Sequence, residues 1–325
     1  MLYRQLGRTG LIVSEIGFGA WGIGGGLWQG SDDAASLEAL QAALDAGCTF
    51  IDTALAYGDG HSERLIARAL GGRREAMVVA TKVPPKDRVW PALRGVPLAR
   101  AFPADYVRRC AATSAANLGR AVDLLQFHVW RDEWRAEGDW VAVERTLEAL
   151  IAAGTVRHVG ISINDHEPES ALAAVRDWDL LGAVQVIYNI YDRSPERELF
   201  PLCRERNIGA IVRVPLDEGG LTGKIVPGVT FPPDDFRSRY FRGDRPAQVA
   251  EHVARLEPVV RREAGSLVEG ALRFCLSHPA VGTVIPGMRT AAHARANCAV
   301  SDGRHLSPAL LADLRAQAWE RNFYA

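Results

Sequence analysis

Short apolar segments alternate with amphipathic segments along almost the whole 325-residue chain. The apolar runs are continuous rather than alternating: LLQF at 124–127, VQVIY at 184–188, IGAIV at 208–212 and VGTVI at 281–285. Such runs are typical of strands buried on both faces, as in a parallel sheet. About eight strand–helix units follow one another without a low-complexity linker. This pattern predicts an α/β fold, a closed (β/α)8 TIM barrel, formed by a single domain over 1–325.

The pattern also sets expected bounds for the elements. We expect strands at 50–52, 77–82, 123–128, 158–162, 183–187, 208–214 and 282–285. We expect helices at 31–46, 62–70, 102–118, 139–153, 168–176, 195–206, 247–264, 267–276 and 291–299, and from 308 onward. We expect an N-terminal β-hairpin at 3–16 before the barrel and accessory helices at the end of the chain. Ser31 is expected to cap the first helix, and Gly71–Gly72 is expected to end the second helix. The irregular segment 217–246 is long enough to predict a functional loop.

Composition and charge exclude several classes of function. The net charge of −1 argues against a nucleic-acid partner or an anionic membrane surface. Apolar stretches are too short to span a bilayer, and no basic-then-apolar leader opens the chain, so a cytoplasmic protein is expected. The five cysteines form no C-x-x-C pair and the eight histidines no H-E-x-x-H spacing. Neither a disulfide framework nor a metal site is therefore expected.

Four polar residues fall at or just beyond the ends of neighbouring predicted strands. The chain has only three lysines among its 38 basic residues: Lys82, Lys86 and Lys224. Lys82 ends one strand, Asp52 ends the preceding strand, and His128 ends the following one; Tyr57 lies in the loop after Asp52. The carboxyl ends of the strands of a barrel meet at one face, where active sites form. We therefore expect these side chains to converge.

These residue types together suit carbonyl reduction. A Tyr hydroxyl is a weak acid with a reference pKa of ~10, and a nearby ammonium lowers that pKa. Asp52 can pair with the ammonium of Lys82, and His128 can donate to a carbonyl oxygen. The set places a proton donor beside an oxygen that gains negative charge. Taken singly, each residue has a structural alternative: a turn cap for Asp52, a loop aromatic for Tyr57 and a core histidine for His128.

The motifs that contain these residues resemble the aldo-keto reductase family. The resemblance rests on DTALAYG at 52–58 with the following Gly60, Ser62 and Glu63, on Thr81-Lys82, and on DLLQFH at 123–128. It extends from the N-terminal hairpin to about Asn297. It implies a catalytic tetrad in which Tyr57 is the general acid, Lys82 lowers the pKa of Tyr57, Asp52 pairs with Lys82 and His128 positions the carbonyl. It also implies an NADP-dependent oxidoreductase that reduces an aldehyde or ketone, sugar-like or aromatic, as its small-molecule substrate.

The resemblance also implies a nicotinamide cofactor, NADP(H), extended across the barrel mouth. Ser162, Asn164 and Gln185 would hold the carboxamide, although Ile163 separates a pair that is commonly adjacent in the family. Arg213 stands where a Tyr usually stacks on the nicotinamide. The other residues implied at the cofactor are Gly19, Ala20, Trp21, Asp52, Val214, Pro215, Leu216, Gly219, Leu221, Gly223, Lys224, Gly287, Met288, Arg289, His293 and Asn297. Backbone amides before a helix, with an arginine, suit a phosphate and favour NADP over NAD.

Two further points bear on function. The spacing Gly17-x-Gly19-x-x-Gly22 matches a dinucleotide fingerprint but is not followed by a helix, so we interpret it as a strand-to-loop turn. Aromatic residues in the loops predict an apolar substrate pocket, the alternative being loop packing. The residues expected to contact substrate are Trp21, Tyr57, Trp90, His128 and Trp130.

Two other functions stay open from the sequence. One is a lyase that forms an imine through Lys82, which the neighbouring Asp52 disfavours because an ion pair keeps Lys82 protonated. The other is an NADPH-binding regulatory subunit with weak catalysis.

Overall fold

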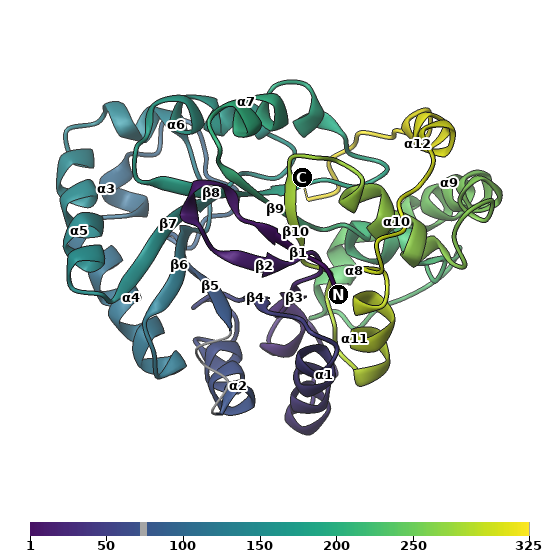
Figure 1. Cartoon of the computed structure of the whole chain (residues 1–325), viewed down its shortest axis with the longest axis horizontal. Coiled ribbons are helices and arrows are strands. Elements are labelled where there is room, and N and C mark those ends of the chain that lie inside the picture. The colour runs from purple at the N-terminus through teal and green to yellow at the C-terminus, as the bar shows by residue number, and fades with distance from the viewer. Residues whose placement is uncertain (72–76, 325) are drawn as a thin grey trace.

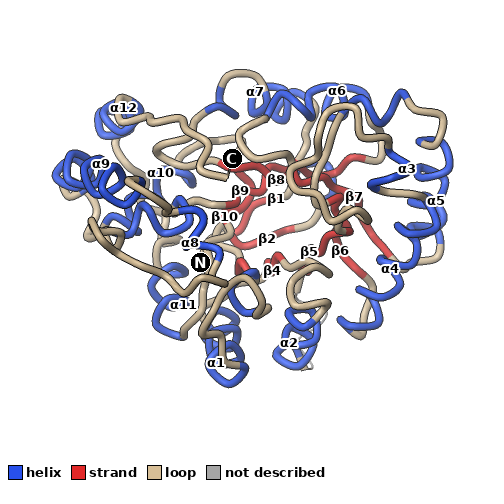
Figure 2. The backbone as a smooth tube through the Cα atoms, turned by 180° about the vertical axis from the view of Figure 1, so that it is seen from behind, coloured by secondary structure: helices blue, strands red, loops and turns tan. Residues whose placement is uncertain are grey.

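The computed structural model describes residues 1–71 and 77–324 of the chain. Eight parallel strands form one sheet in which each strand pairs with its neighbour in sequence (Figure 2). They are β3 (Phe18–Gly19), β4 (Phe50–Asp52), β5 (Val78–Val83), β6 (Val122–Phe127), β7 (Val156–Ser162), β8 (Leu181–Ile187), β9 (Gly209–Arg213) and β10 (Val281–Val284). Parallel bridges Ile16–Val284 and Gly19–Gly287 join the last strand to the first segment and close the barrel. The predicted fold class is confirmed.

Helices surround the sheet (Figure 1). The helices between strands are α1 (Asp33–Asp45), α2 (His61–Leu70), α3 (Leu98–Ala101), α4 (Ala104–Leu118), α5 (Trp140–Ala152), α6 (Leu172–Asp177) and α7 (Leu199–Glu205). The segment between β9 and β10 carries α8 (Phe236–Tyr240), α9 (Arg245–Val260) and α10 (Leu267–Leu276), and α11 (Ala291–Cys298) and α12 (Pro308–Arg315) follow β10. The accessory helices α9, α10 and α12 lie together on one side.

Three local expectations need correction or fall outside the described residues. The cap of α1 is Asp32, not Ser31: Asp32 has extended backbone, and its Oδ1 accepts from the Ala35 amide at 2.8 Å. The helices expected at 168–176 and 195–206 each begin with a 3-10 turn. The backbone at Ala171 and Glu198 leaves the helical region, which separates these turns from α6 and α7. The predicted Gly71–Gly72 stop of α2 is seen only as Gly71, because 72 lies outside the described residues.

The N-terminal hairpin closes the bottom of the barrel. Strands β1 (Tyr3–Gln5) and β2 (Ile12–Ser14) pair in antiparallel fashion. Arg4 donates to the carbonyl of Val281 and Arg8 to that of Leu181, both at 2.8 Å, which fixes the hairpin at the amino ends of β10 and β8. Its apolar side chains join a buried interior cluster: Leu6, Val13, Phe50, Val78, Ala80, Leu124, Ala183, Ile211 and Ile285. The opposite end, where the strands finish, is left for a functional site.

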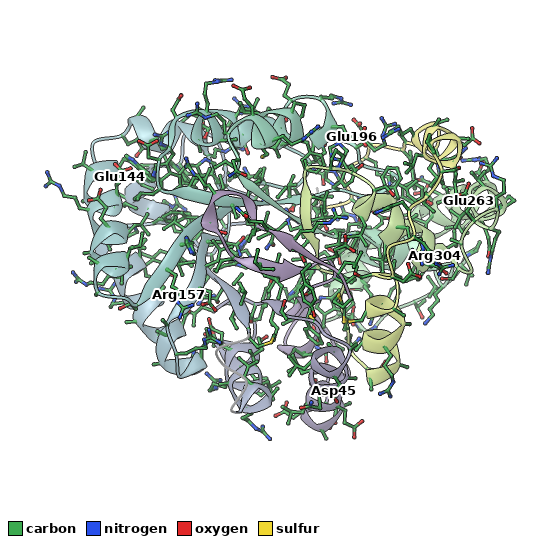
Figure 3. All side chains as sticks on the ribbon, in the orientation of Figure 1. Asp45, Glu144, Arg157, Glu196, Glu263 and Arg304 are labelled. Atoms are coloured by element: carbon green, nitrogen blue, oxygen red, sulfur yellow. The ribbon has the colours of Figure 1, made fainter. Side chains whose placement is uncertain are left out.

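Charged side chains are concentrated on the outer surface. Asp45 lies at the lower edge and Glu263 at the right edge of the molecule in Figure 3. Within residues 1–71 and 77–324, none of the helices has both the length and the apolar character needed to cross a bilayer. In the same residues, His, Cys, Asp and Glu side chains form no group of three able to hold a metal ion.

Candidate active site

Lys82 lies at the centre of a buried cluster at the carboxyl end of the barrel. Its side chain is 1% exposed. The Lys82 Nζ donates to Asp52 Oδ2 at 2.5 Å, to the Thr53 carbonyl at 2.9 Å and to Tyr57 Oη at 3.4 Å. Parallel pairing of β4 with β5 brings these strand ends to one face, as the sequence predicted. The structure thus brings Asp52, Tyr57 and Lys82 into direct contact.

Two amides complete the surroundings of Asp52. Its Oδ1 accepts from Gln185 Nε2 at 2.7 Å and from Gln126 Nε2 at 3.2 Å. A buried carboxylate needs such donors, because desolvation without hydrogen bonds is costly. The amide of Gln185, expected at the carboxamide of a cofactor, therefore contacts Asp52 in this structure. Sequence reasoning missed Gln126, although one polar residue inside the apolar run LLQF is a usable signal.

Tyr57 is held in the loop after β4 by aromatic and glycine neighbours. Its ring stacks on Trp21 with centroids 6.2 Å apart. Gly24 packs against it so closely that an added Cβ would lie 2.8 Å from Tyr57 Cβ. Burial, with a contribution from Asp52, raises the pKa of Tyr57 well above its usual value, and Arg213 opposes the rise. The phenol is therefore protonated at neutral pH.

The net rise reflects burial and does not isolate the effect of Lys82, so the expectation that Lys82 lowers the pKa of Tyr57 stays a prediction. Lys82 is paired with Asp52, and burial is the largest cause of the raised pKa of Tyr57, followed by the charge of Asp52. Burial also lowers the pKa of Lys82 itself, although Asp52 favours its charged form. Tyr57 is thus a protonated donor beside a partly compensated ammonium.

His128 follows β6 and faces Tyr57. Its backbone amide donates to the Val83 carbonyl at 3.0 Å, and its ring lies edge-on to the Tyr57 ring at 5.7 Å. Burial, then the charges of Lys82 and Arg213, hold the pKa of His128 well below its usual value. Its Nδ1 is buried and has no partner within the described residues. The imidazole is therefore neutral and can donate one hydrogen bond from a ring nitrogen to an oxygen.

Arg213 ends β9 and is fixed by a carboxylate. Its Nη2 donates to Asp165 Oδ1 at 2.6 Å and to the Ile163 carbonyl at 2.9 Å. Burial alone would lower the pKa of Arg213, but Asp165, with smaller contributions from Tyr324 and Glu218, makes the net shift upward. Arg213 pairs with Ile187 at the carboxyl ends of β9 and β8, so it lies at the same mouth, where its charge acts on the pKa values of Tyr57, Lys82 and His128.

Asn164 has a different immediate partner from the one the resemblance implies. Its Oδ1 accepts from the Ala92 amide at 3.1 Å, and its Nδ2 donates to the Ala92 carbonyl at 3.2 Å. The side chain therefore fastens the loop that carries Trp90. Ser162 ends β7 opposite Gln185 in the strand register, so both remain at the mouth.

The expected substrate aromatics divide into two groups. Trp90 is 43% exposed, and its ring lies edge-on to His128 at 5.8 Å. Trp21 also lies at the mouth, against Tyr57. Trp130 does not: it is fully buried and stacks on Trp178 at 5.4 Å in a cluster that includes Trp140. The chain turns outward after His128, so the expectation that Trp130 lines the substrate pocket is wrong.

The residues at the mouth fit an extended dinucleotide. After β9, the turn Asp217–Thr222 contains Gly219, with φ of 107° and open space where a side chain would be; Gly287 has the same open space. Buried donors without a protein partner among the described residues stand at the mouth and in the loop after β3: Trp28 Nε1, His128 Nδ1 and Arg213 Nε. A dinucleotide needs backbone that can approach its phosphates closely. It also needs hydrogen-bond donors that have no partner in the protein.

Positive charge gathers near the amino end of α11. Lys224 and Arg289 both act on His293, whose pKa is lowered first by burial and then by these two cations. Arg289 Nη2 donates to the Gln29 carbonyl at 2.6 Å, which anchors it against the loop after β3. Met288 and Asn297, in contrast, have buried side chains. The helix amino end and its cations suit a phosphate group.

Comparison with known proteins places this arrangement in a family. The model of the Aldo/keto reductase family matches residues 15–316. Aldo-keto reductase YhdN of Bacillus subtilis is 31% identical over 297 residues, which cover 89% of this chain and 85% of that protein. The NADH-specific methylglyoxal reductase of Escherichia coli is 27% identical over 310 residues, with 90% and 91% covered.

The fold of this chain also matches that of a solved structure along nearly the whole length of both chains. The glycerol dehydrogenase AKR11B4 from Gluconobacter oxydans superposes with a TM-score of 0.79 at 26% identity, covering 97% of this chain and 94% of that one. The sequence match, the superposition and a barrel mouth that joins Asp52, Tyr57 and Lys82 lead to one conclusion: the chain belongs to the aldo-keto reductase family.

Proposed function

We propose that this protein reduces an aldehyde or ketone to an alcohol with NADPH, and that Tyr57 is the proton donor. The observation that supports this most strongly is the unbroken chain of contacts from Asp52 through Lys82 to Tyr57, with His128 facing the same phenol. The bound cofactor would supply the hydride. The residues of the chain would supply orientation and the proton.

Each residue has a distinct task in this proposal. Tyr57 donates its hydroxyl proton to the carbonyl oxygen as that oxygen gains negative charge. Lys82, at 3.4 Å from the hydroxyl, stabilises the phenolate left behind. Asp52 keeps Lys82 charged in spite of burial, which lowers its pKa. His128, neutral because its pKa is depressed, donates a hydrogen bond to the same oxygen without adding charge.

The substrate class follows from the walls of the mouth. Trp21 and Trp90 supply apolar faces on either side of Tyr57 and His128. Such walls suit a small carbonyl compound with a ring or a sugar face. For the cofactor, Lys224, Arg289 and His293 near α11 would hold the adenosine phosphate, which favours NADPH over NADH.

One alternative has a specific observation in its favour. The lowered pKa of Lys82 is the direction that an imine-forming lysine requires. The carboxylate 2.5 Å away, the Thr53 carbonyl and an exposure of 1% oppose it, because they keep the amine charged and shielded. Borohydride trapping of a carbonyl substrate on Lys82, without nicotinamide binding, would establish the alternative.

A single experiment separates these functions. NADPH and NADH are titrated by protein fluorescence, and a panel of carbonyls is then assayed at the absorbance band of the reduced nicotinamide, with wild type and Tyr57→Phe. We expect NADPH to bind both proteins and turnover to fall roughly 10²- to 10⁴-fold in Tyr57→Phe, the range for a lost general acid. Full activity in Tyr57→Phe would contradict the assignment. Tight binding without turnover over the whole panel would indicate a regulatory subunit.

A further inference from the structure

Trp90 is an exposed indole whose position beside His128 is set by the backbone of its loop. The loop 84–97 joins β5 to α3, and Trp90 within it is 43% exposed. Its ring nevertheless lies edge-on to the His128 ring, with centroids 5.8 Å apart. An exposed side chain gains little from packing, and surface loops are the more mobile parts of a protein. A contact elsewhere in the loop must therefore keep the two rings together.

That contact is made at Ala92, which follows Trp90 and Pro91. Arg131 Nε donates to the Ala92 carbonyl at 2.7 Å. The Asn164 side chain binds both the amide and the carbonyl of Ala92, at 3.1 and 3.2 Å. Arg131 Nη2 also donates to Glu167 Oε2 at 3.0 Å. Side chains from the loops after β6 and β7 thus meet at one residue of the loop after β5.

Arg131 and His128 belong to one short segment after β6. The His128 amide donates to the Val83 carbonyl at 3.0 Å, which fixes the start of the segment to the barrel. Trp130, directly before Arg131, is fully buried, which fixes its end. The hydrogen bond from Arg131 then ties this rigid segment to the loop that carries Trp90. The separation of the two rings is therefore set by Arg131 as well as by the rings themselves.

The burial of Arg131 is unusual for a residue that only fills space. Arg131 is 5% exposed, so its guanidinium has lost most of its contact with water. The side chain of Glu167, the carboxylate that compensates the charge, is 36% exposed. Burying a charged pair costs free energy that the attraction often does not recover, and apolar residues of similar volume are often as stable. A buried arginine whose Nε binds a loop carbonyl is better explained by positioning than by stability.

Within the proposed function, on which this inference rests, Tyr57 and His128 hold the carbonyl oxygen of the substrate. The group attached to the carbonyl carbon then extends past His128, where the Trp90 ring lies 5.8 Å away. An aromatic group gains a stacked or edge-to-face contact with the indole at this place, whereas a short alkyl chain offers too little surface for one. The position of the Trp90 loop therefore affects which carbonyl compounds bind well.

We propose that Arg131 is a positioning residue for the substrate. By holding Ala92 it keeps Trp90 beside His128, and it thereby favours carbonyl compounds that carry an aromatic group over short aliphatic aldehydes. Arg131 acts through Trp90 and takes no part in the transfer of the proton or the hydride. Its effect on substrate binding should therefore disappear once the Trp90 side chain has been removed.

Steady-state kinetics with saturating NADPH test the proposal on para-nitrobenzaldehyde and propanal. In Arg131→Met we expect the KM for para-nitrobenzaldehyde to rise roughly three- to tenfold, the order of one aromatic contact. The kcat and the KM for propanal should not change, because only a binding contact is lost. Trp90→Ala should show the same rise, and Arg131→Met/Trp90→Ala no more than Trp90→Ala alone. Arg145→Met, an exposed arginine replaced on α5, should match wild type.

A second variant keeps the test decisive if Arg131→Met does not fold. Arg131→Lys retains a charge for Glu167 but not the planar fork that also reaches Ala92, so it should show the same rise in KM for para-nitrobenzaldehyde. An unchanged KM in both variants, or equal losses for the two aldehydes, would overturn the proposal. So would a double variant whose loss is the product of the two single losses. Failure of wild type to reduce any carbonyl would instead overturn the proposed function itself.

Discussion

Removing Lys82 should reveal how strongly the buried ion pair depends on both partners. The side chains of Lys82 and Asp52 are 1% and 4% exposed, and their contact is 2.5 Å. Lys82→Met leaves the Asp52 carboxylate with only the amides of Gln126 and Gln185. Breaking a buried pair from one side costs about 3–5 kcal/mol. Because the amides of Gln126 and Gln185 still donate hydrogen bonds to the carboxylate, we expect a loss of unfolding free energy at the lower end of this range, about 3 kcal/mol at pH 7.

A double variant isolates the interaction. Asp52→Asn/Lys82→Met removes both charges, and replacement of a buried pair by neutral groups is often nearly neutral, so we expect a loss of about 1 kcal/mol or less. In Lys82→Met the unpaired carboxylate binds a proton more tightly in the folded than in the unfolded protein. Its stability should therefore be higher at pH 5 than at pH 8.

Urea unfolding followed by tryptophan fluorescence measures these differences at both pH values. Wild type and Asp52→Asn/Lys82→Met are the controls. If Lys82→Met is as stable as wild type, or no less stable than the double variant, the charge of Asp52 does not depend on Lys82, and the electrostatic description of the site is wrong.

Three other predictions concern single side chains. Asn164→Ala should raise the KM for the carbonyl several-fold and leave the Kd for NADPH unchanged, because it frees the Ala92 loop that carries Trp90; a weakened Kd with normal KM would show a cofactor contact instead. Trp130→Ala should lower the unfolding free energy by about 3–5 kcal/mol without changing KM, since Trp130 lies in the interior; a raised KM in a normally stable variant would contradict this. His128 should show no imidazole titration by NMR between pH 5.5 and 8, because burial depresses its pKa, and a midpoint near 6.5 would contradict this.

The barrel and the central contacts could be predicted because they depend on short-range patterns. Runs such as that at 281–285 specify buried parallel strands, and parallel strands bring their ends to one face whatever the loops do. Asp52, Lys82 and His128 each stand at or just beyond a strand end, so their convergence follows from the fold. Tyr57 required the family motif as well, because a loop residue has no position fixed by periodicity.

The parts that could not be predicted depend on three-dimensional burial. The sequence predicts the pairing of Lys82 with Asp52, but no spacing shows how deeply Tyr57 is buried, and burial is the largest cause of its raised pKa. Trp130 is adjacent in sequence to mouth residues, but the chain turns away from the mouth just before it. The partners of Asn164 and Glu218 come from residues 72 and 106 positions away, distances at which sequence patterns carry no information.

The central claim is that the Tyr57 phenol, beside Lys82, gives its proton as the carbonyl accepts hydride. Single-turnover reduction of a carbonyl by protein preloaded with NADPH measures this step directly, with wild type, Tyr57→Phe and the distant control Tyr106→Phe compared by stopped flow. We predict that Tyr57→Phe binds NADPH normally and transfers hydride roughly 10²- to 10⁴-fold more slowly, whereas Tyr106→Phe matches wild type. Hydride transfer at the wild-type rate in Tyr57→Phe would contradict the account.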